Sequence, residues 1–193
     1  MFFVLSGFLI TTILLNTRES PQYFSSFYMR RVLRIFPLYF AAIFAFFHIL
    51  LPLMHRAGQM LDVSSAPELW YWLYASNWRQ GLGAAPIWHL SHFWSLAIEE
   101  QFYLVWPAVV YLLSARQLRN ACGVLIAGGL GLRGWFAIHG ASAEFLHSIT
   151  FLRLDTLAFG ALVALLRHEQ DQVPQSKGAA QVRGSGLGHR GPR

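Results

Sequence analysis

Side chains that can exchange protons gather in the segment 88–107 of the chain. On a helix, residues three, four and seven apart return to the same face, and this spacing aligns His92, Glu99 and Trp106. Glu100 lies about 100° away around the same helix. Two adjacent carboxylates near the start of an apolar segment are costly to remove from water. Their presence therefore indicates a functional role. The alternative is the start of an interfacial helix, with acidic residues in its first turns.

A second candidate for chemistry is the basic cluster of Arg30, Arg31 and Arg34. Spacings of three and four residues bring these side chains together on a helix over 24–36. One interpretation is a phosphate-binding site for a nucleotide-like ligand, because guanidinium pairs with phosphate through two hydrogen bonds. The other is a cytoplasmic interfacial helix that binds anionic headgroups, with Pro37 starting the next span.

Small residues mark two expected helix contacts. Ser6 and Gly7 interrupt the first apolar segment, and Gly160 and Ala164 form a small-xxx-small pair in the last one. Such residues let two helix backbones approach closely inside a membrane. We therefore predict helix packing at both places.

Arg153 and Asp155 interrupt the start of the last apolar segment. Residues two apart do not face each other on one helix, so we expect each to pair with another element. A structural ion pair and a functional role both remain open for them.

The composition indicates whether these groups lie in a water-soluble protein or in a membrane protein. Of the 193 residues, 55% are hydrophobic and only 12% are charged, whereas soluble domains carry about a quarter charged residues. Too little polar surface remains to coat a water-soluble globule, so we predict a membrane protein. In a membrane protein, the net charge of +6 indicates how the chain is oriented across the membrane rather than that it binds nucleic acid. Cys122 is the only cysteine, and the other histidines, including His48, His55, His139 and His147, have no metal-ligand spacing, so no metal site is expected.

Five hydrophobic segments suggest an all-α, polytopic bundle of about five transmembrane spans. A full span needs roughly 20 residues, which the last four provide, whereas the first is shorter. The stretch 68–78 is rich in Trp and Tyr and fits the membrane interface better than a sixth span. The five segments are Met1–Leu15, Ile35–Met54, Phe93–Leu113, Ala121–Ile138 and Ser148–Leu166.

Alternating spans place most basic residues on one side of the membrane. The loop Arg18–Arg34, the turn 114–120 and the chain after Leu166 hold 11 of the 15 Lys and Arg residues. By the positive-inside rule this side is cytoplasmic. The segment 171–193 has almost no large apolar residues and is predicted to be a disordered polar tail.

Taken together, these motifs resemble the acyltransferase 3 family of multi-span membrane acyltransferases. Four stretches carry the resemblance, and they occur in the family's order with similar spacing. They are Phe-Phe-Val-Leu-Ser-Gly-Phe-Leu-Ile-Thr at 2–11, Phe-Tyr-Met-Arg-Arg-Val-Leu-Arg-Ile-Phe-Pro-Leu-Tyr at 27–39, His-Phe-Trp-Ser-Leu-Ala-Ile-Glu-Glu-Gln-Phe-Tyr-Leu-Val-Trp-Pro at 92–107 and Arg-Leu-Asp-Thr-Leu-Ala-Phe-Gly-Ala at 153–161.

The resemblance implies a plasma-membrane enzyme that takes an acyl group, often acetyl, from an acyl-CoA on the cytoplasmic side. The acceptor would be a hydroxyl of a sugar, a glycan or a lipid-linked sugar. Acyl-CoA is then a substrate rather than a resident cofactor, and its phosphates would meet Arg30, Arg31 and Arg34. The residues expected to carry the chemistry are Ser6, His92, Glu99, Glu100 and Tyr103.

One departure from the family pattern concerns the histidine to which its catalysis is attributed. That histidine lies on a helix preceding the Ser-Gly-Phe motif, and no histidine here matches the position. Further family spans follow the Arg-Leu-Asp motif, where this chain has a polar tail. We therefore expect residues 1–170 to be a partial membrane acyltransferase domain, truncated at both ends.

Two other functions remain open from the sequence. In a transporter-like protein, Glu99 and Glu100 would relay protons or substrate across the membrane. In a non-catalytic remnant, the chain would insert into membrane but would neither bind acyl-CoA nor acylate an acceptor.

Overall fold

The computed structural model describes residues 2–58, 68–85 and 87–185, with the backbone alone at 88 and 172–185. In these ranges every regular element is helical, as the sequence predicts. The long helices are α1 (Phe2–Thr17), α2 (Tyr23–Phe44), α6 (Phe93–Leu112), α7 (Ala115–Ile138) and α9 (Leu154–Ser185). Shorter ones are α3 (Leu51–Arg56), α4 (Glu68–Trp72), α5 (Ser76–Gly81) and α8 (Ala143–Ser148). The tail was expected to begin at 171, but α9 continues to Ser185, and 186–193 lie outside the described residues.

Two helical stretches are long and apolar enough to cross a membrane, Tyr23–Arg56 and Ala115–Ile138. Helix α1 is apolar but shorter. The stretch 68–78 forms α4 and the start of α5 with a turn between them, so it does not make a continuous span. The five-span topology stays a prediction, because length and composition support two spans in the described part of the chain.

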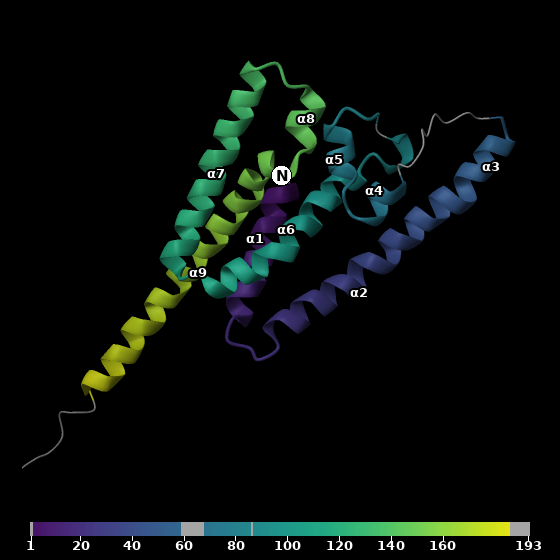
Figure 1. The fold of residues 1–193 in the computed structure, drawn as a ribbon. Helices are drawn as coiled ribbons and strands as arrows, with labels where there is room; N and C mark the ends of the chain where they lie inside the picture. Colours follow the sequence, from purple (N-terminus) through teal and green to yellow (C-terminus); the bar gives the residue numbers. More distant parts are fainter. Residues whose placement is uncertain (1, 59–67, 86, 186–193) are drawn as a thin grey trace, which may run out of the picture.

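The helix that begins at Tyr23 does not restart at Pro37, contrary to the expected break between an interfacial helix and a span. Pro37 lies inside α2, and a π-helical stretch, Ala45–Leu50, joins α2 to α3. A proline removes one backbone hydrogen bond but can be accommodated within a long helix. The arginine cluster and the following apolar segment therefore belong to one continuous helix, which runs beside the rest of the bundle in Figure 1.

Helices α1 and α9 pack so closely that the backbone of each helix contacts a glycine of the other. A Cβ atom built on Gly7 would lie 2.1 Å from the carbonyl oxygen of Leu157, and one on Gly160 would lie 2.0 Å from that of Val4. Both distances are too short for any side chain. The two small-residue contacts predicted from the sequence are thus the two sides of one interface.

Side-chain hydrogen bonds fix α6 beside α1 and α2. The Trp106 indole donates to Thr11 Oγ1 at 2.8 Å, and the Tyr28 hydroxyl donates to the Leu104 carbonyl at 2.8 Å. At the end of α6, Arg18 donates to the carbonyls of Tyr111 and Leu113 at 3.0 and 2.9 Å. The last carbonyl groups of a helix have no N–H partner within that helix. Arg18 therefore both caps α6 and holds the α1–α2 turn against it.

The ionisable residues at the start of α9 do pair with other elements, as predicted. Asp155 forms a salt bridge with Arg133 of α7, and only 6% of the Asp155 side chain is exposed. Arg153 donates from Nε to the His147 carbonyl at 2.9 Å and also contacts His147 Nδ1. Partial burial, together with this guanidinium, lowers the pKa of His147 below its usual value. Both pairs support a structural role for this motif.

Replacing Gly160 with Ala should destabilise the bundle by about 1–3 kcal/mol, because the added methyl group overlaps the Val4 carbonyl. The matched control is Gly131→Ala on α7, where a Cβ meets nothing within 4 Å and helix propensity alone changes. Thermal unfolding in detergent micelles measures both. Equal melting temperatures for the two variants would show that α1 and α9 do not pack at Gly160.

Replacing Asp155 with Asn should cost about 2–4 kcal/mol, because Arg133 would lose its charged partner in a largely buried place. Arg119→Ala breaks the exposed pair with Glu169 and should cost less than about 1 kcal/mol. The double change Arg133→Met with Asp155→Leu should recover most of the loss, since no unpaired charge remains. Unfolding by denaturant compares the variants, and a double variant no more stable than Asp155→Asn contradicts this account.

Candidate functional site

Four of the predicted site residues meet where α1, α2 and α6 approach one another. Ser6 Oγ and the Tyr103 hydroxyl are hydrogen-bonded to each other. The Glu99 carboxylate lies against both hydroxyls, and Arg31 lies over the Tyr103 ring with its Cζ atom 4.5 Å from the ring centroid. Three separate sequence motifs therefore supply one cluster.

Glu99 is the buried carboxylate of this cluster. The residue is 4% exposed, and its Oε1 atom has no hydrogen-bond partner among the described residues. A buried carboxylate oxygen without a partner is costly, so a ligand hydroxyl or amide that reached it would form a favourable hydrogen bond. The adjacent cavity, of about 300 Å³, is lined by Glu99, Ser6, Tyr103, Arg31 and Arg34 together with apolar residues of α1, α2 and α6.

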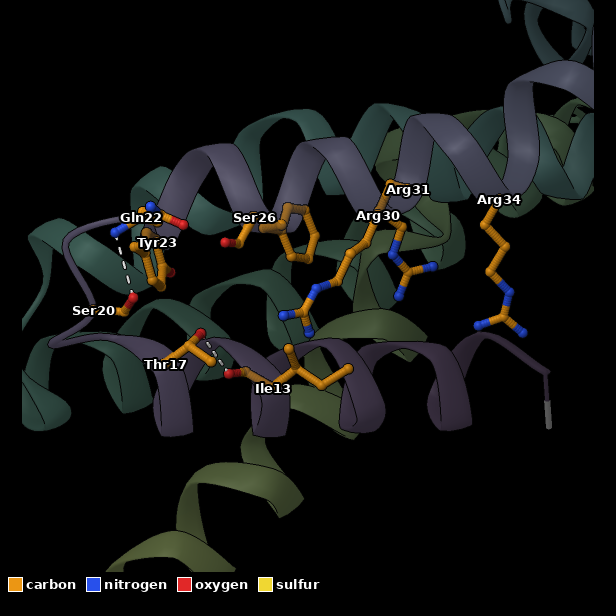
Figure 2. Close-up of a pocket in the computed structure, with 10 residues that line it drawn as sticks. Ile13, Thr17, Ser20, Gln22, Tyr23, Ser26, Arg30, Arg31 and Arg34 are labelled. Carbon is orange, nitrogen blue, oxygen red and sulfur yellow. Dashed lines mark hydrogen bonds between the residues drawn. The ribbon is translucent and has the colours of Figure 1, made fainter.

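A second cavity, of about 230 Å³, lies further along the same pair of helices, α1 and α2. Figure 2 shows Arg30, Arg31 and Arg34 reaching from α2 toward α1. The other polar lining residues are Gln22 and four that bear hydroxyl groups, Thr17, Ser20, Tyr23 and Ser26. Arginines and hydroxyls together are the donors that bind phosphate groups, so this cavity suits a polyanion.

The two cavities share two lining residues, Arg31 and Arg34. Alternating spans would put the Arg18–Arg34 loop at the opposite end of the bundle from the start of the Phe93–Leu113 segment, whereas Arg31, Arg34 and Glu99 line one cavity. Tyr23 donates to the Pro107 carbonyl and Tyr28 to the Leu104 carbonyl, so α2 runs antiparallel to α6. Arg31, about two turns into α2, therefore comes level with the middle of α6.

Phe27 of α2 also contributes to the site. The Arg31 Cζ atom lies 5.8 Å from the Phe27 ring centroid as well as 4.5 Å from that of Tyr103. No ion pair or hydrogen bond of Arg31 with the described residues accompanies these ring contacts. The i,i+4 spacing of Phe27 and Arg31 was the signal in the sequence that indicated this contact.

Glu100 and His92 lie apart from the Ser6–Glu99–Tyr103 cluster. The Glu100 carboxylate is near Tyr39 and Tyr74, around α6 from Glu99, as the 100° step predicts. Its Oε1 atom is buried without a hydrogen-bond partner in the described ranges. His92 is exposed at the N-cap of α6 and lines neither cavity. The catalytic roles expected for both residues stay predictions.

Gln101, the next residue, has a structural task. Its amide donates to the Tyr74 carbonyl at 2.8 Å and to Asn77 Oδ1 at 3.0 Å. Thr150 donates to Gln101 Oε1 at 2.6 Å. This network ties α4, α5 and the segment before α9 to α6, and so fixes the rotation of α6 that points Glu99 at the cavity. In the described ranges, no three His, Cys, Asp or Glu residues lie close enough together to bind a metal ion.

Comparisons with known proteins agree on one family. The chain is 32% identical to the peptidoglycan O-acetyltransferase OatA of Listeria monocytogenes over 148 residues, which is 72% of this chain and 24% of that protein. It is 31% identical to the O-acetyltransferase OatA of Staphylococcus aureus over 177 residues, 86% of this chain and 29% of that protein. A putative O-acetyltransferase of S. aureus strain COL is 32% identical. The chain thus spans about a quarter of the length of these relatives.

No solved structure matches the chain. The sequence profile of one family, described as an acyltransferase domain, covers residues 1–180 and includes the three motifs that meet at the site. On this match, and on the identity to the O-acetyltransferases, the chain belongs to the acyltransferase 3 family.

Proposed function

We propose that this chain forms the acyl-transferring part of a membrane-bound O-acyltransferase, which moves an acyl group, typically acetyl, from acyl-CoA to a glycan hydroxyl. The observation that carries the proposal is the shared wall of the two cavities. Arg31 and Arg34 line both a basic cavity and the cavity of Ser6, Glu99 and Tyr103. An anionic donor and a hydroxyl acceptor would therefore meet at these arginines.

The basic cavity is the proposed site for the phosphates of the donor. An acyl-CoA carries several phosphate charges, and Arg30, Arg31 and Arg34 supply three cations beside four hydroxyl-bearing residues. With the phosphates held there, the pantetheine arm would extend past Arg31 toward Glu99. A cavity of about 230 Å³ is too small for a whole coenzyme A, so the adenosine would lie at its mouth.

The Glu99 carboxylate is the proposed partner of the acceptor hydroxyl. It would accept the hydrogen bond of that hydroxyl while the hydroxyl oxygen attacks the thioester carbonyl carbon. A C–O ester bond then forms, the C–S bond breaks, and the proton passes by way of the carboxylate to the leaving thiolate. Ser6 and Tyr103, hydrogen-bonded to each other beside Glu99, would hold the carboxylate in place.

A cell-wall or other surface glycan is the proposed acceptor. The first relative is named for peptidoglycan and the second only for O-acetylation. The first name supports a sugar hydroxyl of a polymeric glycan as the acceptor, and a lipid-linked sugar would offer the same group. We place the enzyme in the plasma membrane as a multi-pass protein, supported by the two helices able to span it. The Arg18–Arg34 segment and the C-terminal tail would face the cytoplasm, where acyl-CoA is present.

Replacing Arg34 with Ala should weaken binding of coenzyme A roughly tenfold, because one charge-assisted contact to phosphate is lost. Arg34→Lys should recover only part of the affinity, since an ammonium group cannot bind phosphate through a planar pair of donors. Arg56→Ala changes an arginine at the far end of the same helical stretch, outside both cavities. Calorimetric titration of the purified protein measures all three, and equal affinities for Arg34→Ala and Arg56→Ala would remove the donor site from this cavity.

Replacing Glu99 with Gln should lower the rate of acyl transfer about 10²- to 10⁴-fold, the usual contribution of a positioned acid or base. Donor binding should stay unchanged, because the phosphate-binding arginines remain. The control is Glu144→Gln, an exposed glutamate at the start of α8. Transfer of radiolabelled acetyl to peptidoglycan fragments in membrane vesicles is the assay, and full activity of Glu99→Gln excludes the proposed role.

A further inference from the structure

Tyr103 contacts both halves of the proposed site. Its hydroxyl is hydrogen-bonded to Ser6 beside Glu99, and its ring lies under the Arg31 guanidinium. The residue is 4% exposed, so this double contact is made in the interior. Tyr103 therefore links Arg31 to the pair of Ser6 and Glu99 by direct contact.

The contact of Arg31 with the ring leaves its hydrogen-bonding capacity free. A guanidinium that stacks on an aromatic face keeps its N–H donors in its own plane, pointing away from the ring. Arg31 forms none of the ion pairs and hydrogen bonds of the described residues, although it lines both cavities. The rings of Tyr103 and Phe27 therefore contact the cation without using its N–H donors, which remain available to an anion.

We propose that Tyr103 is a positioning residue for both halves of the site. Its ring orients Arg31 for the donor's anionic group, and its hydroxyl orients Ser6 and Glu99 for the acceptor. This rests on the proposed function and adds a coupling to it. An ordered anion at Arg31 is thereby held at a fixed distance from the carboxylate that receives the acceptor hydroxyl, as group transfer requires.

Two substitutions separate the two contacts of Tyr103. Tyr103→Phe keeps the ring, so coenzyme A affinity and the donor KM should match those of the unaltered protein, while kcat falls about tenfold or more. Tyr103→Leu also removes the ring. Coenzyme A affinity should then fall about three- to thirtyfold, the range expected for a desolvated cation–π contact.

The matched control is Phe102→Leu, which removes a neighbouring ring of α6. Phe102 is also buried, but its ring stacks on Trp106 at 4.7 Å rather than on a cation. Stability should fall for Phe102→Leu and Tyr103→Leu alike, whereas coenzyme A affinity should fall only for Tyr103→Leu. If Tyr103→Leu fails to fold, Phe27→Leu takes its place with a smaller loss of affinity, because Phe27 lies farther from Arg31.

Titrating each variant with coenzyme A and with inorganic pyrophosphate separates this inference from the proposed function. Loss of affinity for pyrophosphate in Tyr103→Leu but not in Tyr103→Phe supports the positioning role, even if coenzyme A does not bind and the donor assignment fails. Normal coenzyme A binding by Tyr103→Leu overturns the positioning role and leaves the donor site standing. Failure of the unaltered protein to bind either anion overturns both.

Discussion

The close approach of α1 to α9 is the constraint on which the site depends. Gly7 and Gly160 each face a backbone carbonyl of the other helix at a distance that no side chain could share. In lipid, the hydrophobic effect does not favour association of two apolar helices, because lipid tails are as apolar as the helices. Close van der Waals packing must therefore stabilise the contact. Ser6 directly precedes Gly7, so the interface that fixes α1 also fixes one hydroxyl of the candidate site.

Polar contacts then set how α6 and α2 are rotated about their axes. Trp106 binds Thr11, and Gln101 holds the α4–α5 turn, on two different sides of α6. Each of these donors would otherwise be buried without a partner, a cost that few alternative rotations of the helix could avoid. The result is that Glu99 lines the cavity beside α1, while Glu100 is directed to the tyrosines near α2 and α4.

The charged groups divide into those that pair within the protein and those that are left available. Asp155 with Arg133, and Arg153 with His147, join the C-terminal part of α7 and helix α8 to the start of α9. Arg31 forms no such pair among the described residues, although Glu99 and Glu100 are both near it. A cation that contacts two rings and lines two cavities is well placed for an external anion, so the proposed donor and acceptor sites share Arg31 and Arg34.

The helical fold, the family and the bounds of α1 and α6 follow from the sequence, because apolar periodicity and the four motifs are local properties. The bounds of α2 and α9 do not, because α2 begins well before Pro37 and α9 continues past the apolar segment. The small-residue contacts and the separate partners of Arg153 and Asp155 were also predictable, since spacing on a helix shows which residues face away from each other. Only the tertiary structure showed that Arg31 meets Tyr103, because that contact joins residues 72 positions apart and depends on the antiparallel crossing of α2 and α6. Periodicity specifies the face of each helix but not the height at which two helices meet, and here that height brings the arginines and Glu99 to the same cavity.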